Sequence, residues 1–477
     1  MTDSSRLPGA FKRELEAKFE GYSWDKVKAS VKRSVYHLTK QGYPGVYLKV
    51  FHPGDLFQRI RNLISPRTQK EADMLKELAD SGIPVAEVLA HFCHGTSSAI
   101  AVKEVQDSRP LICFEKGFQE KILFSVARDL LEHGFVHDDL HPGNILIDNK
   151  DHYIMIDCYE VKKKNSIRLS DRINSFAMTA SVFGTSRSVI KTFLPDYDQR
   201  TISTIESSAN NIRRRRIKRR IKRSLSDGSF SRIEKNRDYR AIVRRDETLE
   251  LEEIINIHRN NLRTGSNLLK VQEKTQVSIV GAYCVKTYKK SPMLLEHYAL
   301  RAWKGSLILE FNGFRVAEPD ACVILKDKSS MLISKKLEYP QLDRLLSGGR
   351  LNAQENKNLA VSIGLTIGRM HLSGIFHADL KACNIFIDTD MNEALFIDTD
   401  RVTQLRHISR EKRMRNLMQI GLSIPRAVAI SAGRAMIDAY ATQTGDSAEA
   451  LFNEMKLKMK GKEIVYTTDE GDRFEVC

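Results

Sequence analysis

The stretch FVHDDLHPGNILIDNKDHYIMID, residues 135–157, sets five aspartates and three histidines between short aliphatic runs. Three kinds of structure carry such a pattern: a metal site, a solvated acidic loop and a phosphoryl-transfer centre. The choice among them depends on whether the pattern recurs in the chain with the same spacing.

The pattern does recur, in GIFHADLKACNIFIDTDMNEALFIDTDRV, residues 374–402. Both copies contain His-x-Asp-Leu-x-x-x-Asn-Ile and then a strand that ends in Ile-Asp. Asp139 precedes Asp157 by 18 residues, and Asp379 precedes Asp398 by 19 residues. The chain therefore reads as a tandem repeat of about 240 residues, which suits two whole domains.

Each copy also has an upstream lysine in a strand-like run. Lys49 in VYLKVF lies 90 residues before Asp139, and Lys286 in AYCVKTY lies 93 residues before Asp379. An isolated strand lysine is ordinarily a surface residue, so only its place in the repeated constellation gives it significance.

Helix and turn signals surround both motifs. Ile122, Val126 and Leu130 recur every four residues, and Gly134 closes the predicted helix. The second copy repeats this arrangement up to Gly374. A hairpin is predicted after each motif, so the acidic side chains should face one cleft.

That arrangement suits phosphoryl transfer from ATP with Mg²⁺. The metal takes hard oxygen ligands, and the acceptor hydroxyl needs an oriented carboxylate to receive its proton. The spacing Asp-Leu-x-x-x-Asn, followed by a strand and an aspartate, distributes these roles. In the first copy it predicts Asp139 as the catalytic base and Asn144 and Asp157 as magnesium ligands.

In the second copy the same roles fall on Asp379, Asn384 and Asp398. Lys49 and Lys286 are predicted to bind the α and β phosphates of ATP.

Other interpretations explain less. A chance match or a capped turn would not bring two lysine strands at matching distances. A zinc site would use His137, His141 and His152, but the second copy keeps only His377. His137 and His377 are better explained as residues that orient the loop.

Composition narrows the partners. The formal charge of +16 predicts attraction to an anionic partner. No stretch reaches the roughly 18 apolar residues of a membrane span, and the start lacks the apolar region of a secretory signal. Seven scattered cysteines form no CxxC pair. We expect a cytoplasmic protein.

The motifs HDDLHPGNILI with MIDCYEV, and HADLKACNIFI with FIDTDRV, resemble those of the bacterial lipopolysaccharide kinases. These are the inner-core heptose and Kdo kinases of the protein-kinase-like superfamily. The resemblance implies an α+β fold with two tandem bilobal kinase-like domains, each with a small mixed β lobe and a larger helical lobe. The expected boundaries are 1–200 for the first domain, 201–224 for a basic linker and 225–477 for the second domain.

The copies differ around the lysine. Neither has a GxGxxG loop before it. Glu71 lies on a predicted helix 22 residues after Lys49, so a Lys-Glu pair is expected there. An ungapped alignment puts Ala302 opposite Glu71, and Glu296, almost two turns earlier, is a substitute that we do not favour.

The catalytic loops differ as well. Lys381 follows Asp379 by two residues, where the first copy has His141. A lysine at this position would neutralise charge on the transferring phosphoryl group.

Residues 211–223, NIRRRRIKRRIKR, carry nine arginines and lysines. A solvated linker helix is one reading, and contact with anionic lipid head groups or with a phosphorylated substrate through Arg213, Arg214, Arg215 and Arg216 is the other. Nucleic acid is disfavoured because no aromatic residues are interleaved. The resemblance implies lipopolysaccharide or an acidic precursor as partner, with peripheral contact at the inner membrane.

Three functions follow. The first is an ATP- and Mg²⁺-dependent kinase that phosphorylates a sugar hydroxyl of the lipopolysaccharide inner core. The second is a protein Ser/Thr kinase, which the absence of a glycine loop and of an APE-like segment disfavours. The third is one active domain regulated by a pseudokinase partner domain.

Overall fold

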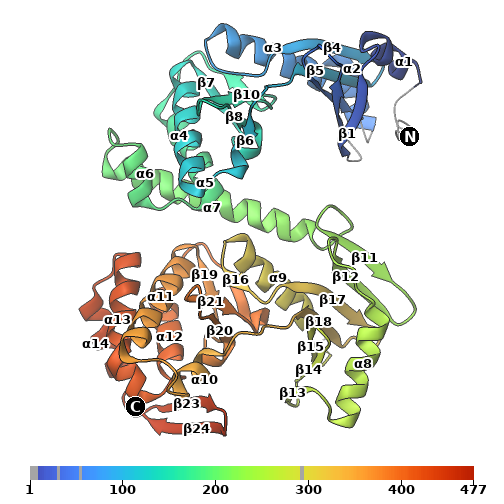
Figure 1. Cartoon of the computed structure of the whole chain (residues 1–477). Coiled ribbons are helices and arrows are strands. Elements are labelled where there is room, and N and C mark those ends of the chain that lie inside the picture. Colours follow the sequence, from blue (N-terminus) through green and yellow to red (C-terminus); the bar gives the residue numbers. More distant parts are fainter. Residues whose placement is uncertain (1–8, 30–32, 53–55, 291–294) are drawn as a thin grey trace. The chain divides into compact units, whose positions relative to one another are not determined.

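The computed structural model describes residues 9–29, 33–52, 56–290 and 295–477. Within them, helices and strands are mixed along the whole chain (Figure 1). The chain divides into two compact units, Met1–Arg213 and Arg214–Cys477, which we call unit 1 and unit 2. The division falls inside one helix, α7 (Gln199–Arg223).

Unit 1 begins with an antiparallel five-stranded sheet in the order β1-β2-β3-β5-β4. Its strands and the neighbouring helices are α1 (Gly9–Lys18), β1 (Ser23–Ala29), β2 (Arg33–Thr39), β3 (Val46–Phe51), α2 (Leu56–Ile64), α3 (Arg67–Asp80), β4 (Val88–His94) and β5 (Ser97–Lys103). Alternate residues of β2, such as Tyr36 and Leu38, are buried against α1, as expected of a strand with one covered face. Helix α3 packs through Ala72 and Leu75 on the other face.

The rest of unit 1 is mainly helical. Its elements are β6 (Arg109–Pro110), η1 (Leu111–Cys113), α4 (Lys116–Glu132), β7 (Phe135–His137), η2 (Pro142–Asn144), β8 (Ile145–Ile147), β9 (Tyr153–Met155), β10 (Val161–Lys163), α5 (Leu169–Phe183), α6 (Arg187–Phe193) and α7. The apolar face of α4 enters the core through Val126 and Leu130. The helix ends before Gly134, whose φ of 83° is strained for other residues, and the chain turns directly into β7.

Unit 2 begins with an antiparallel seven-stranded sheet in the order β11-β12-β17-β18-β15-β14-β13. Its elements are β11 (Ser231–Lys235), β12 (Tyr239–Arg244), α8 (Leu251–Thr264), β13 (Leu268–Val271), β14 (Thr275–Val280), β15 (Tyr283–Tyr288), α9 (Tyr298–Phe311), β16 (Arg315–Val316), β17 (Pro319–Leu325) and β18 (Ser330–Lys335). Helix α8 packs on one face of this sheet and α9 on the other. Trp303 of α9 is fully buried, and its indole N–H donates to Ser224 Oγ at 3.3 Å.

The remainder of unit 2 is again mainly helical. Its elements are α10 (Leu342–Ser347), α11 (Ala353–Leu372), β19 (Ile375–His377), η3 (Ala382–Asn384), β20 (Ile385–Asp388), β21 (Glu393–Phe396), η4 (Thr399–Arg401), β22 (Val402–Gln404), α12 (Arg410–Gly421), α13 (Arg426–Thr444), α14 (Ala448–Met459), β23 (Glu463–Thr468) and β24 (Gly471–Val476). Asn352 caps α11 by accepting from the N–H groups of Gln354 and Glu355. A Cβ at Gly364 would lie 2.2 Å from Met436 O, so this glycine allows α11 and α13 to pack closely.

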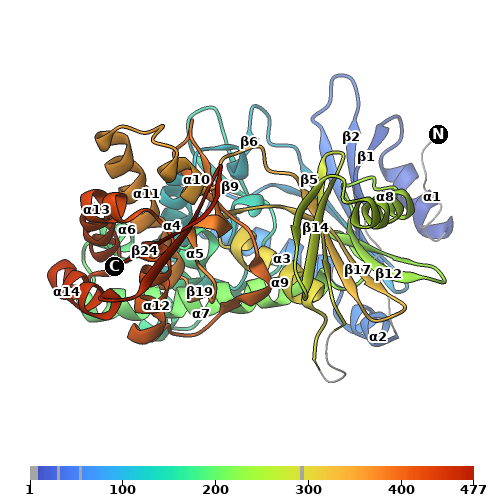
Figure 2. The ribbon, with the colours of Figure 1, turned by 90° about the horizontal axis from the view of Figure 1, so that it is seen from below.

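The C-terminal strands β23 and β24 form an antiparallel hairpin. Figure 2 shows this hairpin in dark red beside α10. Strand β23 also contacts η3, which belongs to the loop that carries the second sequence motif.

Candidate active sites

In unit 1 a buried ion pair holds the strand lysine. Lys49 Nζ of β3 lies 2.8 Å from Glu71 Oε1 of α3 and donates to Ile156 O at 2.7 Å. Glu71 is only 1% exposed. Burial by itself would lower the pKa of Lys49, but Glu71 and Asp157 outweigh it and hold the pKa above its usual value.

Asp157, at the end of the β8–β9 hairpin, lies among cations. Its carboxylate is 3.3 Å from Arg33 Nη1. Burial would raise the pKa of Asp157, but Lys49, Arg33 and Arg67 together lower it. The carboxylate is therefore anionic at neutral pH.

The catalytic-loop residues of unit 1 hold one another by short polar contacts. The N–H of Asp139 donates to His137 Nδ1 at 3.1 Å, and Asn144 Nδ2 donates to Asp139 O at 3.3 Å. Burial lowers the pKa of His137 to about 4, so the imidazole is neutral and can accept. His141 Nε2 lies 3.9 Å from Asp139.

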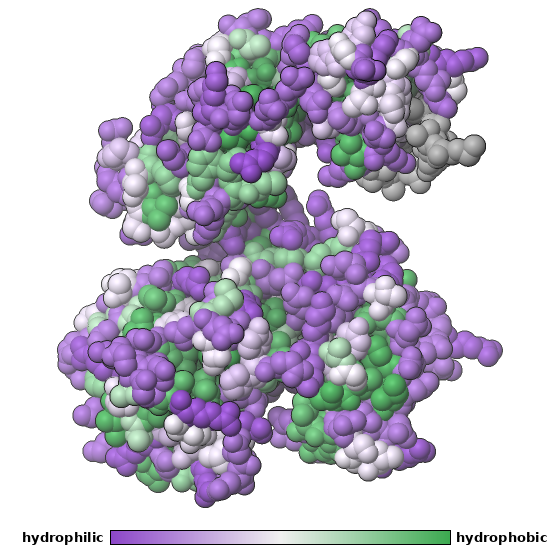
Figure 3. Space-filling model, in the orientation of Figure 1, coloured by the Kyte–Doolittle hydropathy of each residue, from purple (hydrophilic) through white to green (hydrophobic). Residues whose placement is uncertain are grey.

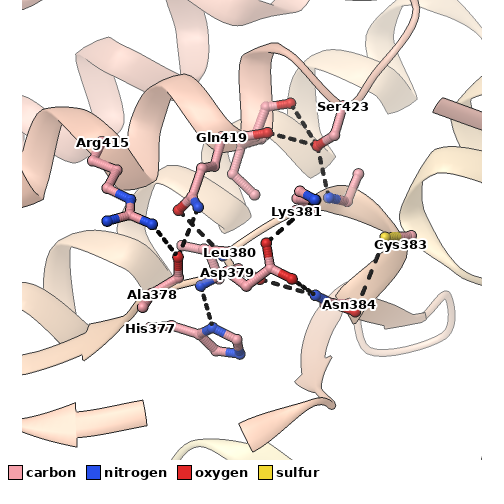
Figure 4. Close-up of polar contacts among 12 residues, drawn as sticks. His377, Ala378, Asp379, Leu380, Lys381, Cys383, Asn384, Arg415, Gln419 and Ser423 are labelled. Atoms are coloured by element: carbon pink, nitrogen blue, oxygen red, sulfur yellow. Dashed lines mark hydrogen bonds and ion pairs between the residues drawn. The ribbon is translucent and has the colours of Figure 1, made fainter. Parts of the chain in front are cut away.

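The corresponding loop of unit 2 repeats this geometry and adds a bond to the aspartate side chain (Figure 4). The N–H of Asp379 donates to His377 Nδ1 at 3.3 Å. Asn384 Nδ2 donates to Asp379 O at 2.9 Å and to Asp379 Oδ2 at 3.3 Å. Lys381 Nζ lies 3.4 Å from Asp379 Oδ1, so a cation lies beside the predicted base.

Gln419 of α12 and Ser423, two residues after that helix ends, support this loop. Gln419 donates to Ala378 O at 2.8 Å and accepts from the N–H of Leu380 at 3.2 Å. Ser423 Oγ accepts from the N–H of Ala382 at 2.8 Å (Figure 4). The sequence reasoning missed both. Their polar side chains at four-residue spacing after the second motif are the signal that could have found them.

The strand lysine of unit 2 has a different partner from its counterpart in unit 1. Lys286 Nζ of β15 lies 2.6 Å from Asp398 Oδ1. Glu296 instead pairs with Lys304 of α9. Ala302 is fully buried, and its carbonyl accepts from Thr399 Oγ1 at 2.9 Å.

Asp398 is unusual in two respects. Its φ of 55° puts a non-glycine residue in the left-handed region. Burial would raise its pKa, but the Lys286 ammonium outweighs burial and lowers it. Burial and the charge of Asp398 raise the pKa of the neighbouring Asp400 to about 6, so these two carboxyl groups differ strongly in acidity.

The donor set in both units suits magnesium. The side-chain Nδ2 atoms of Asn144 and Asn384 donate to the backbone carbonyls of Asp139 and Asp379. The side-chain oxygens therefore point away from these carbonyls. Mg²⁺ prefers such oxygen ligands and is commonly held by one or two carboxylates together with substrate phosphates. Within the described residues no group of three or more His, Cys, Asp and Glu side chains is placed to hold a metal ion.

A large cleft is lined by the predicted site residues of unit 2 other than Asp379. Its volume is about 1090 Å³, and its lining includes Lys286, Lys381, Asn384 and Asp398. Figure 3 shows unit 2 hollowed between its sheet and its helical part. Pockets for one small ligand typically span roughly 300–1,000 Å³. The cleft therefore lies at the upper end of the volumes found for small-ligand pockets.

The basic segment 211–223 is the second half of α7. Two of its predicted contact residues bind backbone carbonyls, Arg213 that of Val182 at 3.2 Å and Arg214 that of Leu405 at 3.0 Å. Arg216 is half-buried. The exposed cations are Arg215, Lys218, Arg219, Arg220, Lys222 and Arg223. No helix in the described part of the chain is both long and apolar enough to span a membrane.

Comparisons with protein families match two segments of the chain. Residues 314–438 match the lipopolysaccharide kinase (Kdo/WaaP) family, and residues 96–178 match the ABC1 atypical kinase-like domain. The resemblance to lipopolysaccharide kinases is thereby confirmed for the segment around Asp379. The predicted enzyme class, a phosphotransferase with an alcohol group as acceptor, is confirmed as well.

The solved structures that are similar to this chain are kinase-like. Aminoglycoside-3'-phosphotransferase of type VIII is 17% identical with a TM-score of 0.32, and the match covers 41% of this chain and 96% of that chain. Spectinomycin phosphotransferase APH(9)-Ia, solved with ADP and spectinomycin, is 12% identical with a TM-score of 0.34. That match covers 45% of this chain and 88% of the phosphotransferase. WbdD is 17% identical with a TM-score of 0.28, and the match covers 39% of this chain and 45% of WbdD. No curated protein matches the chain.

Proposed function

We propose that the chain transfers the γ-phosphoryl group of ATP to a sugar hydroxyl of the lipopolysaccharide inner core, and that unit 2 carries out the transfer. The observation that carries this proposal is the loop of Asp379, Lys381 and Asn384. Lys381 and Asn384 of this loop line the same cleft as Lys286 and Asp398, and the loop lies within the segment that matches the lipopolysaccharide kinase family.

The proposal includes two tandem kinase-like bilobal domains, 1–200 and 225–477, joined by the basic segment 201–224. Three features support it. Both units have an antiparallel sheet covered by helices on both faces, followed by a mainly helical part. Both have a lysine in an inner strand of the sheet and the same loop geometry after a short strand. Each matches its own kinase-like model.

In the proposed reaction the hydroxyl oxygen of the acceptor bonds to the γ-phosphorus of ATP, and Asp379 accepts the proton of that hydroxyl. The bond between the γ-phosphorus and the oxygen that bridges it to the β-phosphate breaks. Lys286 binds the α and β phosphates, and Lys381 neutralises charge on the transferring group. Asn384 and Asp398 would hold Mg²⁺, which supplies charge neutralisation on the phosphates when bound. ADP is the leaving product.

Unit 1 has the complete set of Lys49, Glu71, Asp139, Asn144 and Asp157, so we propose that it also binds ATP with Mg²⁺. Its pairing of Lys49 with Glu71 favours a nucleotide-binding role in particular, because the ammonium is fixed before any phosphate arrives. A chain with one transferring domain and one regulatory domain is the alternative to two active sites.

We propose that the exposed cations of α7 attract the acidic glycolipid or the anionic membrane surface. Arg215, Lys218, Lys222 and Arg219 recur at three- to four-residue intervals, so they share one side of the helix. Arg213 and Arg214 bind backbone carbonyls and contribute less.

The proposed enzyme activity is tested by transfer of labelled γ-phosphate from ATP to purified deep-rough lipopolysaccharide, beside a generic protein acceptor. Label on the glycolipid that is lost in Asp379→Asn supports the proposal. Label on protein alone supports the protein-kinase alternative. Bound nucleotide without transfer to either acceptor supports a pseudokinase.

The membrane contact is tested by flotation with vesicles of anionic and neutral lipids over a range of salt concentrations. The Arg219→Gln/Lys222→Gln variant should bind anionic vesicles less than the wild type does, and added salt should reduce the difference. Lys326→Gln/Lys328→Gln removes two exposed lysines elsewhere and serves as the control. Equal binding by both variants would contradict the assignment to α7.

A further inference from the structure

The C-terminal hairpin β23–β24 forms one wall of the cleft in unit 2. Glu463, Val465, Thr467 and Asp469 line the cleft, and so does Asp472 of the returning strand. Successive strand residues point to opposite faces, so the odd-numbered residues of β23 share the face that borders the cleft. Thr467 is paired with Asp472 across the hairpin, which puts both on that face.

The opposite face holds the hairpin in place. Ile464 is fully buried. The N–H of Val465 donates to Leu422 O at 2.9 Å, directly after α12. The N–H of Thr467 donates to Asp343 Oδ2 of α10 at 3.1 Å. The wall is therefore fixed to two helices of the same unit.

Asp343 is notable because it is a buried carboxylate of the cleft lining that binds the hairpin backbone. It is 1% exposed, and burial raises its pKa. Ser347 of the same helix adds a bond from its hydroxyl to Thr467 O at 3.3 Å. Helix α10 thus binds both the backbone N–H and the backbone C=O of Thr467.

The position of the wall assigns it to the acceptor rather than to the nucleotide. The phosphates are proposed to bind Lys286 on β15, at the sheet side of the cleft. The hairpin instead contacts α10 and η3, in the mainly helical part of the unit. An acceptor hydroxyl has to reach Asp379 from the side that the nucleotide does not occupy.

The chemistry of this wall suits a carbohydrate. Val465 offers an apolar surface to the C–H face of a sugar ring, and Thr467 and Asp472 offer oxygens that accept from ring hydroxyls. Lys381 and Arg344 line the same cleft and can meet anionic groups on the acceptor. The hairpin lies beyond residue 438, where the match to the lipopolysaccharide kinase family ends.

We infer that the β23–β24 hairpin binds the carbohydrate part of the acceptor and that Val465 and Thr467 are specificity-determining residues of unit 2. This inference rests on the proposed function, because it names the part of the cleft in which the acceptor sugar lies.

The first test measures steady-state transfer from ATP to deep-rough lipopolysaccharide in the full chain. Val465→Trp should raise KM for the glycolipid about tenfold or more, because the indole ring would occupy space that the sugar needs. The same variant should change KM for ATP less than about twofold. Thr467→Val removes one hydroxyl at constant size and should raise the acceptor KM about fivefold. Arg473→Ala, on the other face of the hairpin, is the matched control and should change neither constant.

The second test needs no turnover. Deep-rough lipopolysaccharide added without ATP should slow hydrogen exchange at residues 463–468, and Val465→Trp should abolish this protection. Transfer by the wild type with unchanged acceptor KM in both variants would overturn the inference and leave the proposed function standing. Protection without any transfer would overturn the proposed function and keep the hairpin as a carbohydrate-binding wall.

Discussion

Lys49 and Lys286 occupy the same place in the sequence repeat, yet they bind different carboxylates. Lys49 is paired at 2.8 Å with Glu71, a residue of helix α3. Lys286 is paired at 2.6 Å with Asp398, the predicted metal ligand of its own unit. The repeat therefore conserves the lysine and its strand but not the source of the compensating charge.

The reason lies in how closely the helix packs. In unit 2, Gly305 is so near to η4 that a Cβ there would lie 2.0 Å from Thr399 O. Ser306 Oγ and Thr399 Oγ1 are 2.8 Å apart, and Thr399 also donates to Ala302 O. Small residues on α9 let this helix contact the segment after Asp398 directly. In unit 1, by contrast, helix α3 carries Glu71, which forms the buried ion pair with Lys49.

The positions of Lys49 and Lys286 therefore depend on different carboxylates. Lys49 is held by a pair that belongs to the fold, so its position is independent of what the cleft contains. Lys286 shares its carboxylate with the proposed metal site, so its position is coupled to substrate binding. This contrast is consistent with the proposal that unit 1 holds a nucleotide and that unit 2 carries out the transfer.

The largest expected effect separates the units by activity. Asp379→Asn should lower kcat for transfer to deep-rough lipopolysaccharide by roughly 10²–10⁴-fold, because the hydroxyl loses its base. Asp139→Asn should lower it by less than about threefold under saturating ATP. Initial rates with labelled ATP measure both, and equal losses would assign transfer to both units.

The next effect separates the units by stability. Glu71→Gln leaves the Lys49 ammonium buried without a compensating anion and should lower the free energy of unfolding of unit 1 by about 3–5 kcal/mol. Glu296→Gln breaks a partly exposed pair with Lys304 in unit 2 and should cost less than about 1 kcal/mol. Urea denaturation, with hydrogen exchange to locate each transition, measures the two. Similar costs would contradict the claim that the buried pair of Lys49 and Glu71 is worth much more than the partly exposed pair of Glu296 and Lys304.

Acid should destabilise both units through buried histidines. Burial lowers the pKa of His137 in unit 1 and of His371 in unit 2 to about 4. The unfolded histidine, with a pKa near 6.5, binds a proton first, so each contribution is complete above pH 6.5 and is lost as the pH falls toward 4. The loss should be about 2 kcal/mol per histidine at pH 5.

Urea denaturation between pH 7 and pH 5 measures this slope. His371→Gln should reduce the slope for unit 2 without removing it, because burial also lowers the pKa of His258 to about 4. His407→Gln, at an exposed position, should leave the slope unchanged. A slope that is the same in His371→Gln as in the wild type would contradict the contribution of His371.

The smallest effect probes the close packing of α9. Gly305→Ala should destabilise unit 2 by about 1–2 kcal/mol, since the methyl group meets the Thr399 backbone. Gly433→Ala in α13, where a Cβ would meet nothing within 4 Å, should instead stabilise it by roughly 0.5–1 kcal/mol through helix propensity. Thermal unfolding of both variants gives the two signs, and a neutral Gly305→Ala would mean that α9 can shift away from η4.

Local patterns in the sequence predicted the local structure well. The runs around Lys49 and Lys286 are strands, and a hairpin follows each motif. The helix that was expected to end before Gly134 does so, because a positive φ there requires a glycine. These features depend on a few neighbouring residues, so spacing and turn residues are enough to find them.

Contacts between distant segments were beyond such patterns. Nothing near Asp343 in the sequence indicates that it accepts the N–H of Thr467, more than a hundred residues later. The alternation in EIVYTTDEGDRFEV was a usable hairpin signal, but it did not place the hairpin at the cleft. The Lys286–Asp398 contact likewise depends on how closely α9 packs, which periodicity cannot supply.

The burial of Trp303 in unit 2 has a practical consequence. The chain has two tryptophans, and the other, Trp24, lies on β1 of unit 1. Each unit thus carries its own intrinsic fluorophore, and a buried indole changes its emission when its surroundings unfold. Trp24→Phe and Trp303→Phe would each leave a single optical reporter, so that ligand binding and unfolding of either unit can be followed separately in the intact chain.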